Sequence, residues 1–490
     1  MNWVLHLGRG HILDRLKKII FLFTFLFFII PSSAQVNYTR FTNQIDSLLS
    51  TDFFNSTIAS VKIYDLTTSN ILYEKNSSLL LRPASNLKLF TTAAGLLYLG
   101  KDFKFNTTAY YFGEISDNSL EGDLFIKGGF DPFFKIDDLD SIIMDLKKLN
   151  VEEIEGNIYA DVSNKDSLFW GKGWMWDDDP EPSAPYLSSL NINENSVQVI
   201  VKPQNINQSS EVIFYPESNY FFQEVNVNTI EGDSSKIRVT RDWVNRKNKI
   251  FVGGYQSYKD NFDTTGVNIF RPELFFINLF KEKLNENDID FSGELDTLTI
   301  PKDVTIFSSI KRGLDSVIIK TNKESNNLGA EMILYSLAEK YFGKPAAAEN
   351  GVKLIDSLIT LIGDNPEDYR IVDGSGVSHY NLISANLIID LLKFMYSGNE
   401  ELFNLYFNSL PVAGIDGTLE KRMINGPAYN NVHTKTGTLS GVSNVSGYLT
   451  GKNGDKIAFS ILMQNYVGKS KPVRNFQDSL LTIISLFNEE

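Results

Sequence analysis

The sequence has 490 residues, of which 42% are hydrophobic and 22% are charged, and its formal net charge is −14. This acidic balance argues against a nucleic-acid-binding protein, because phosphate contacts require a basic face. The chain contains no cysteine, which excludes disulfides, a thiol nucleophile and thiolate metal sites. The length corresponds to roughly three domains.

The first 34 residues predict a secretory signal peptide. Four basic residues precede the apolar run from Ile19 to Ile30, which is shorter than the ~20 residues that a membrane span requires. Small residues at Ser32 and Ala34 predict cleavage after Ala34; an uncleaved membrane anchor is the alternative. A large exported chain without cysteine is typical of a bacterial envelope protein. We therefore expect a periplasmic or secreted protein with no stable membrane anchor after cleavage.

The region after the leader combines strands with a helix. Residues 56–76 have the pattern of two strands joined by a polar turn. The segment "RPASNLKLF" (82–90) then begins a helix that we expect to continue to about Leu99, before Gly100. Pro83 suits the first turn of such a helix. Ser85 and Lys88 would share one face of it, because residues three apart on a helix are neighbours.

Two regions with different sequence patterns follow. Residues 101–304 show short strand-like runs separated by Gly, Asn and Asp turns, which predicts a mostly β insertion of one or two nested domains. Helical periodicity returns after residue 305, including a helix that Ser384 is suited to cap. A strand hairpin around Asn453-Gly454 and a final helix complete the chain. We expect a discontinuous α/β catalytic domain, residues 35–100 and 305–490, into which residues 101–304 are inserted.

A serine with a lysine three residues later suggests nucleophilic catalysis. A serine hydroxyl attacks efficiently only when a base removes its proton, and a lysine can be that base when burial or a second cation lowers its pKa. This spacing occurs at Ser85–Lys88 and at Ser308–Lys311, but the second pair ends a strand-like run. We therefore favour Ser85 as nucleophile and Lys88 as base. The alternative for Ser85 is an ordinary helix start.

Two further motifs complete the candidate site. Ser325-Asn326-Asn327 precedes a helix, where its side chains face a cleft unless Ser325 is only a helix cap. Lys435-Thr436-Gly437 begins the run into the C-terminal hairpin and supplies the second cation; its alternative is a solvated lysine at a strand end. A substrate lying beside this strand would pair as an additional strand. The backbone N–H groups of Ser85 and Thr438 would then form an oxyanion hole.

The chain lacks Gly-x-Ser-x-Gly, helical pairs of histidines and a phosphate-binding loop. We therefore expect no metal and no cofactor.

The motifs Ser-x-x-Lys, Ser-x-Asn and Lys-Thr-Gly, in this order, are those of penicillin-binding proteins and serine β-lactamases. Together with "KGGFDP", "WGKGWMWDD", "SAPYLSSLNINENSV", "VDGSGVSHYNLIS" and "NVHTKTGTLSGVSNVSGYLTG", they resemble the D-alanyl-D-alanine carboxypeptidase/endopeptidase family of DacB type, the low-molecular-mass class C penicillin-binding proteins. The resemblance extends from about Thr57 to the final helix. It implies a transpeptidase-like α/β domain, an antiparallel sheet flanked by helices, with nested β-rich domains inserted.

The resemblance also implies roles for the residues. Ser85 would be acylated with Lys88 as base, Ser325 would relay a proton to the leaving amine, and Asn327 would bind the substrate amide. Lys435 and Thr436 would bind the terminal carboxylate, and Lys435 would lower the pKa of Lys88.

The expected substrates are peptidoglycan stem peptides, with β-lactams as covalent inhibitors. Asp178 matches a position that contacts the amine of a diaminopimelate side chain, although Asp177 and Asp179 leave the register open and an acidic solvated loop is the alternative. The "DGSGVS" stretch, residues 373–378, is expected to be a structural turn beside the cleft.

Two alternatives to the carboxypeptidase remain from the sequence. One is a serine β-lactamase or esterase on the same fold, and the other is a catalytically idle cell-wall binding protein. The sequence does not rank carboxypeptidase against endopeptidase activity.

Overall fold

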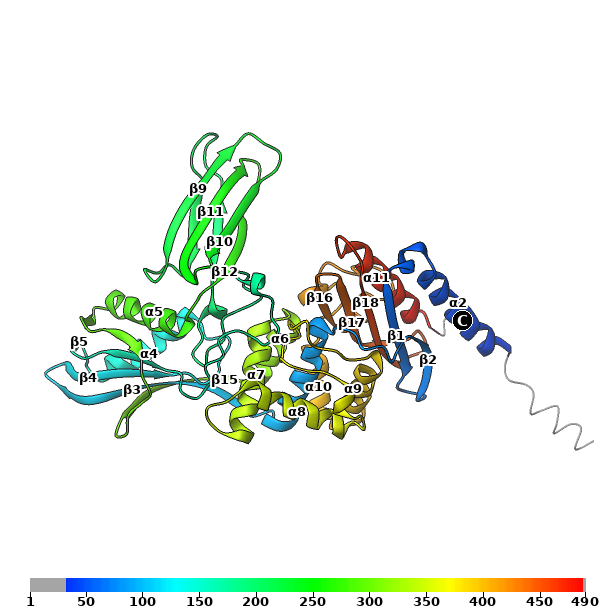
Figure 1. Cartoon of the computed structure of the whole chain (residues 1–490), viewed down its shortest axis with the longest axis horizontal. Helices are drawn as coiled ribbons and strands as arrows, with labels where there is room; N and C mark the ends of the chain where they lie inside the picture. The colour runs from blue at the N-terminus through cyan, green and yellow to red at the C-terminus, as the bar shows by residue number, and fades with distance from the viewer. Residues whose placement is uncertain (1–31, 488–490) are drawn as a thin grey trace, which may run out of the picture.

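A computed structural model describes residues 32–487 (Figure 1). One part of the chain is built on a five-stranded antiparallel sheet of order β16-β17-β18-β1-β2 with helices on both sides. Its strands are β1 (Ile58–Asp65), β2 (Asn70–Lys75), β16 (His433–Leu439), β17 (Val442–Thr450) and β18 (Lys456–Gln464). Strands from the two ends of the chain pair directly, because β1 lies beside β18. The sheet therefore joins the N-terminal and C-terminal parts of the chain into one unit.

Both faces of this sheet are covered by helices. On one face, α2 (Ser32–Leu49) and α11 (Lys471–Ser485) pack together over the strands. On the other face lie α9 (Ala385–Ser397) and the main helical layer. Nearly all residues of β17 and β18 are buried for this reason; β18 is mostly apolar, whereas β17 also buries Ser443, Asn444 and Ser446.

The helical layer contains the segment that carries Ser85. Its members are η2 (Ala84–Leu87), α3 (Lys88–Ala94), η3 (Gly95–Leu99), α6 (Leu314–Lys323), α7 (Asn327–Phe342), α8 (Ala348–Leu361), α9 and α10 (Glu400–Ser409). Eleven consecutive residues of α7, from Leu328 to Ala338, are buried, so this helix lies inside the layer. The expected helix from Ser85 to Leu99 is present as three successive helical segments, η2, α3 and η3. Ser384 caps α9 by accepting the Leu387 N–H.

The expected β-rich region contains a seven-stranded sheet and two helices. Five strands follow the order β13-β5-β4-β3-β15, and β6 and β14 pair beside β4. The elements are β3 (Lys104–Ser116), β4 (Ser119–Lys127), α4 (Ile136–Lys148), β5 (Glu153–Ile154), β6 (Ile158–Asp161), α5 (Pro272–Glu286), β13 (Asp290–Phe291), β14 (Leu295–Thr297) and β15 (Thr305–Gly313).

One predicted boundary has to move. We expected the catalytic part to resume at residue 305, but β15 pairs with β3 in the seven-stranded sheet along its whole length. The physical reason is that β4 occupies only one edge of β3, and β15 forms its backbone hydrogen bonds with the other edge. We now propose that residues 101–313 form the insertion and that the catalytic domain resumes with α6.

Two three-stranded sheets lie between α4 and α5 in the chain. One has the order β12-β7-β8 and the other β10-β11-β9, and in Figure 1 they project upward from the rest. Their strands are β7 (Ser196–Lys202), β8 (Glu211–Tyr215), β9 (Phe222–Ile230), β10 (Lys236–Asp242), β11 (Lys247–Ser257) and β12 (Asp263–Asn268). This arrangement supports our proposal of one domain nested in another.

The predicted signal peptide lies outside the described residues except for Ser32 to Ala34, where α2 begins. Between residues 32 and 487, the structure contains no helix that is both long and apolar enough to cross a membrane.

Candidate active site

Ser85 lies at the start of the helical segment, where the chain turns sharply. Ala84, directly before it, has a φ of 47°, a left-handed conformation that is uncommon for a residue with a Cβ. The chain at Gly376 packs closely against this turn, since a Cβ there would lie 1.9 Å from the Ala84 carbonyl oxygen. Ser85 itself is partly exposed. The strained turn therefore presents the hydroxyl at an accessible point.

Lys88 lies one helical turn after Ser85 and is fully buried. Its Nζ lies 2.9 Å from Ser85 Oγ, 2.5 Å from Asn327 Oδ1 and 2.7 Å from the backbone oxygen of Ser375. Three separate parts of the chain therefore meet at one amine. The helical spacing predicted the contact with Ser85, whereas nothing in the sequence indicated the Ser375 carbonyl.

The environment of Lys88 favours the neutral amine. Burial lowers its pKa from 10.5 to about 7, although the nearby carboxylates of Asp373 and Glu331 act in the opposite direction. A buried charge lacks hydration, which explains the direction of the shift. The sequence left two causes open, burial and a second cation, and burial is the main one; the effect of Lys435 on the pKa of Lys88 stays a prediction.

Lys435 lies within β16, the edge strand of the sheet, and is also fully buried. Burial and the nearby charge of Lys88 lower its pKa well below 10.5. Its Nζ donates to the Thr436 backbone oxygen at 3.0 Å, and the Thr436 hydroxyl donates to that of Thr418 at 2.8 Å. A proton on Lys88 therefore disfavours a proton on Lys435.

The Lys-Thr-Gly strand lies directly against the Ser85 turn. A Cβ at Gly437 would lie 2.8 Å from the Pro83 carbonyl oxygen and 3.0 Å from Ser85 N. Asn444, on the neighbouring strand, holds the same turn by donating from Nδ2 to the Pro83 oxygen at 2.8 Å. Thr438, the next residue along β16, is exposed. The absence of a side chain at Gly437 is what allows β16 to reach Ser85.

The Ser-x-Asn motif contributes Asn327 to the amine site. The cap of α7 is Asn326, whose side chain accepts the Gly329 N–H at 2.8 Å, and not Ser325. Ser325 has a φ of 59° and lies in the turn between α6 and α7. The Asn327 side chain donates from Nδ2 to the Ser183 carbonyl oxygen, so its Oδ1 faces Lys88. Ser325 does not take part in these hydrogen bonds.

The segment from Asp373 to Ser378 does more than form a turn. It supplies the Ser375 carbonyl to Lys88, and its shape is fixed by Asp373, which accepts N–H groups from Gly376 and Ser378 at 3.0 and 2.7 Å. Glu331, one helical turn after Asn327, accepts the N–H groups of Gly374 and Ser375 at 3.0 and 2.8 Å. Burial and the neighbouring Asp373 raise the pKa of Glu331 to about 8.

Sequence reasoning missed Glu331. The one available signal was its position: a glutamate four residues after Asn327, within an otherwise apolar helix. A buried carboxylate requires hydrogen-bond partners.

The three acidic residues of the "WDDD" loop differ in their surroundings. Asp179 is buried and accepts hydrogen bonds from Arg241 Nη2 and from the Tyr186 hydroxyl, each at 2.6 Å. Its carboxylate therefore binds groups inside the protein. Asp177 is exposed. Asp178 accepts the Met175 N–H at 2.8 Å, and partial burial raises its pKa against the opposing effects of that bond and of His379. Asp178 is therefore the half-exposed carboxylate of the three.

The second Ser-x-x-Lys pair is not a dyad. Ser308 and Lys311 lie on β15, where residues three apart point to opposite faces, and the Ser308 hydroxyl donates to Asp145 Oδ2 at 2.7 Å.

Comparison with known proteins decides the family. The family model described as the D-Ala-D-Ala carboxypeptidase 3 (S13) family matches residues 41–484, which is most of the chain and includes every candidate residue. The chain belongs to this S13 family. This membership confirms the expected serine-type D-Ala-D-Ala carboxypeptidase class.

Curated relatives agree with this assignment. The D-alanyl-D-alanine carboxypeptidase DacB of Haemophilus influenzae is 26% identical over 86% of this chain and 91% of its own length. The D-alanyl-D-alanine carboxypeptidase of Actinomadura sp. (strain R39) is 28% identical over 89% of this chain and 84% of its own.

Among solved structures, penicillin binding protein 4 (dacB) from Haemophilus influenzae superposes with a TM-score of 0.79 at 24% identity, covering 90% of this chain and 99% of that one. The S13 chain therefore has the predicted penicillin-binding-protein fold.

Proposed function

We propose that this S13 chain is a serine D-Ala-D-Ala carboxypeptidase that cleaves peptidoglycan stem peptides through an acyl-enzyme on Ser85. The observation that carries the proposal is the set of three oxygens around the Lys88 amine. A neutral amine has two N–H groups and one lone pair. The Asn327 amide oxygen and the Ser375 carbonyl only accept hydrogen bonds, so they take the two N–H groups. The lone pair is left for the Ser85 hydroxyl.

This arrangement defines the acylation step. Lys88 removes the Ser85 proton as Oγ attacks the carbonyl carbon of the penultimate D-alanine. The backbone N–H groups of Ser85 and Thr438 stabilise the resulting oxyanion. When the C–N bond breaks, the proton held by Lys88 passes through Ser325 to the leaving amine, and D-alanine departs. Water then attacks the acyl carbon and gives one proton to Lys88. As the bond between the acyl carbon and Oγ breaks, Lys88 returns that proton to Ser85 and the shortened peptide is released.

The second lysine couples substrate binding to the base. Both amines are buried, and a substrate carboxylate at Lys435 and Thr436 would favour a proton on Lys435. The repulsion between the amines then favours neutral Lys88. Binding of the correct C-terminus would thus generate the base, which explains why both lysines are buried in one site.

Asp178 would distinguish stem peptides. We assign it the free amine of a diamino acid side chain, because it is the half-exposed carboxylate of the "WDDD" loop and its neighbour Asp179 is committed to Arg241. A partly buried carboxylate gains more from an ammonium partner than an exposed one.

The remaining proposals concern the setting of the reaction. The substrate class places the protein in a bacterial cell envelope, periplasmic or secreted, after removal of residues 1–34. β-Lactams would acylate Ser85 in the same way, and cross-linked stem peptides are a second substrate for D,D-endopeptidase activity.

Two measurements test the proposed function. A fluorescent penicillin should label the purified protein covalently at Ser85, and the Ser85→Ala variant should not be labelled. A pentapeptide ending in D-Ala-D-Ala should release one equivalent of D-alanine. Labelling without any D-alanine release would favour an idle penicillin-binding module, and rapid penicillin turnover without a trapped adduct would favour a β-lactamase.

A further inference from the structure

The inserted region reaches the candidate active site through one continuous segment, residues 183–195, which we call the strap. At its start, the Ser183 carbonyl accepts a hydrogen bond from Asn327 Nδ2. At its end, Glu194 accepts from Lys320 Nζ at 2.5 Å and from Asn326 Nδ2. The strap therefore contacts both asparagines of the Ser-x-Asn motif from outside the catalytic part of the chain.

The strap is held rigidly by the seven-stranded sheet region. The Asn193 N–H donates to the Phe134 carbonyl at 2.8 Å, and its side chain accepts the Ile136 N–H at 3.2 Å. Within the strap, Asn195 is fully buried and donates from its side chain to the Tyr186 carbonyl at 2.8 Å. These bonds hold three successive residues, Asn193 to Asn195, at φ values of 46°, 57° and 54°, a conformation that L-residues adopt only when the surroundings fix it.

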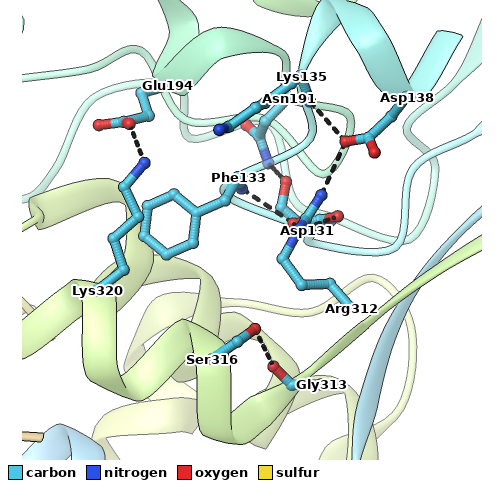
Figure 2. A network of polar contacts seen from close by, with 10 residues as sticks. All are labelled: Asp131, Phe133, Lys135, Asp138, Asn191, Glu194, Arg312, Gly313, Ser316 and Lys320. Carbon is cyan, nitrogen blue, oxygen red and sulfur yellow. Dashed lines mark hydrogen bonds and ion pairs between the residues drawn. The ribbon is translucent and has the colours of Figure 1, made fainter.

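Figure 2 shows the ion pairs around Glu194 at the end of the strap. Arg312 on β15 bridges Asp131 and Asp138, and beside it Lys320 reaches across to Glu194 over the Phe133 ring, 4.3 Å from its centroid. The Lys320–Glu194 pair joins the inserted region to α6, and the two Arg312 pairs lie beside it within the inserted region.

The two partners of Glu194 lie on opposite sides of Ser325. Lys320 is near the end of α6, and Asn326 caps α7. Ser325 lies between them in a left-handed turn, with a φ of 59°. A carboxylate that binds both ends of this turn limits how far either end can move. The same turn determines where the Ser325 hydroxyl and the Asn327 amide point.

We propose that Glu194 is a positioning residue for the reaction: by holding Lys320 and Asn326 together, it fixes Ser325 and Asn327 around the Lys88 amine. This inference rests on the proposed function and extends it, because it makes the inserted region part of the catalytic apparatus rather than only a surface beside it. Glu194 acts only through Ser325 and Asn327, which serve proton transfer at Lys88, so its loss should lower the rate of the chemical step much more than the initial affinity.

The first test measures acylation by a chromogenic penicillin, separating the acylation rate constant from the initial dissociation constant. Glu194→Ala should lower the rate constant at least tenfold and change the dissociation constant less than twofold. The matched control is Asp138→Asn, which loses a bond to Arg312 beside the Lys320–Glu194 pair but does not touch the turn. The control should lower the melting temperature at least as much as Glu194→Ala and change the rate constant less than twofold.

The second test restores the contact with its donor and acceptor exchanged. In Asn326→Asp, one oxygen still caps α7, but the other faces the Glu194 carboxylate and repels it. This variant should therefore acylate at least tenfold more slowly than the unaltered chain. In the double variant Glu194→Gln/Asn326→Asp, the new amide donates to the new carboxylate, and the rate constant should return to within threefold of the original.

The outcomes separate this inference from the proposed function. An unchanged rate constant in Glu194→Ala, an equal loss in Asp138→Asn, or no recovery in the double variant would each overturn the positioning role while leaving Ser85 acylation established. If the unaltered chain is not acylated at Ser85 at all, the proposed function fails, and the inference fails with it.

Discussion

The pH dependence of Ser85 acylation is the most direct consequence of a buried Lys88. Burial lowers the pKa of this lysine to about 7, and only its neutral form can accept the serine proton. The neutral share then rises from ~3% at pH 5.5 to ~97% at pH 8.5, since each pH unit below the pKa is a factor of ~10. The acylation rate constant should therefore rise about 30-fold over this range and become constant above pH 8.

The measurement is the acylation rate constant with a chromogenic penicillin at closely spaced pH values. Lys88→Arg should abolish the rise, because a guanidinium keeps its proton throughout this range. Lys311→Arg, in the second Ser-x-x-Lys pair, is the matched control and should preserve the profile. A lysine with an ordinary pKa would instead give about tenfold per pH unit up to pH 9 and beyond. That result, or a rate independent of pH, would refute burial as the source of the base.

Three further predictions follow from individual contacts. Gly437→Ala should abolish labelling by penicillin and lower the free energy of unfolding by about 1–3 kcal/mol, because its Cβ would clash with the Ser85 turn. The control Gly454→Ala lies in an open hairpin turn and should leave labelling unchanged. Asp178→Asn should raise KM about tenfold, with constant kcat, for peptides that have a free side-chain amine. Asp179→Asn should instead lower the melting temperature, because it breaks a buried ion pair. An equal rise in KM for peptides without that amine would contradict the role assigned to Asp178. Glu331→Gln keeps an acceptor for both N–H groups and removes a group whose carboxylate form raises the pKa of the base, so the midpoint of the acylation profile should move to lower pH. The shift should be small, because the pKa of Glu331 is raised to about 8 and most of this group is uncharged near pH 7; a shift to higher pH would contradict the charge argument.

Local features of the site were readable from the sequence because short-range geometry determines them. The i, i+3 spacing on a helix brings Ser85 and Lys88 together wherever the helix lies, and Ser384 caps its helix through a bond three residues away. Asn453-Gly454 similarly specified a hairpin between adjacent strands.

Contacts between distant segments could not be read in this way. Lys88 donates a hydrogen bond to the Ser375 carbonyl, and Asn327 donates one to the Ser183 carbonyl. Because every residue has a backbone carbonyl, the residue types do not indicate either contact. The position of β15 beside β3 was misjudged for a related reason, because a strand pattern does not indicate which sheet the strand joins.

The sequence by itself therefore determined the family, and it predicted Ser85 as the nucleophile and Lys88 as its base. Only the tertiary structure decided why that base is neutral and what holds it. Burial of Lys88 depends on packing by segments more than 200 residues away, namely Asn327 and Ser375. The free energy of an ionised group depends on the solvent that surrounds it, and that surrounding exists only once the chain has folded.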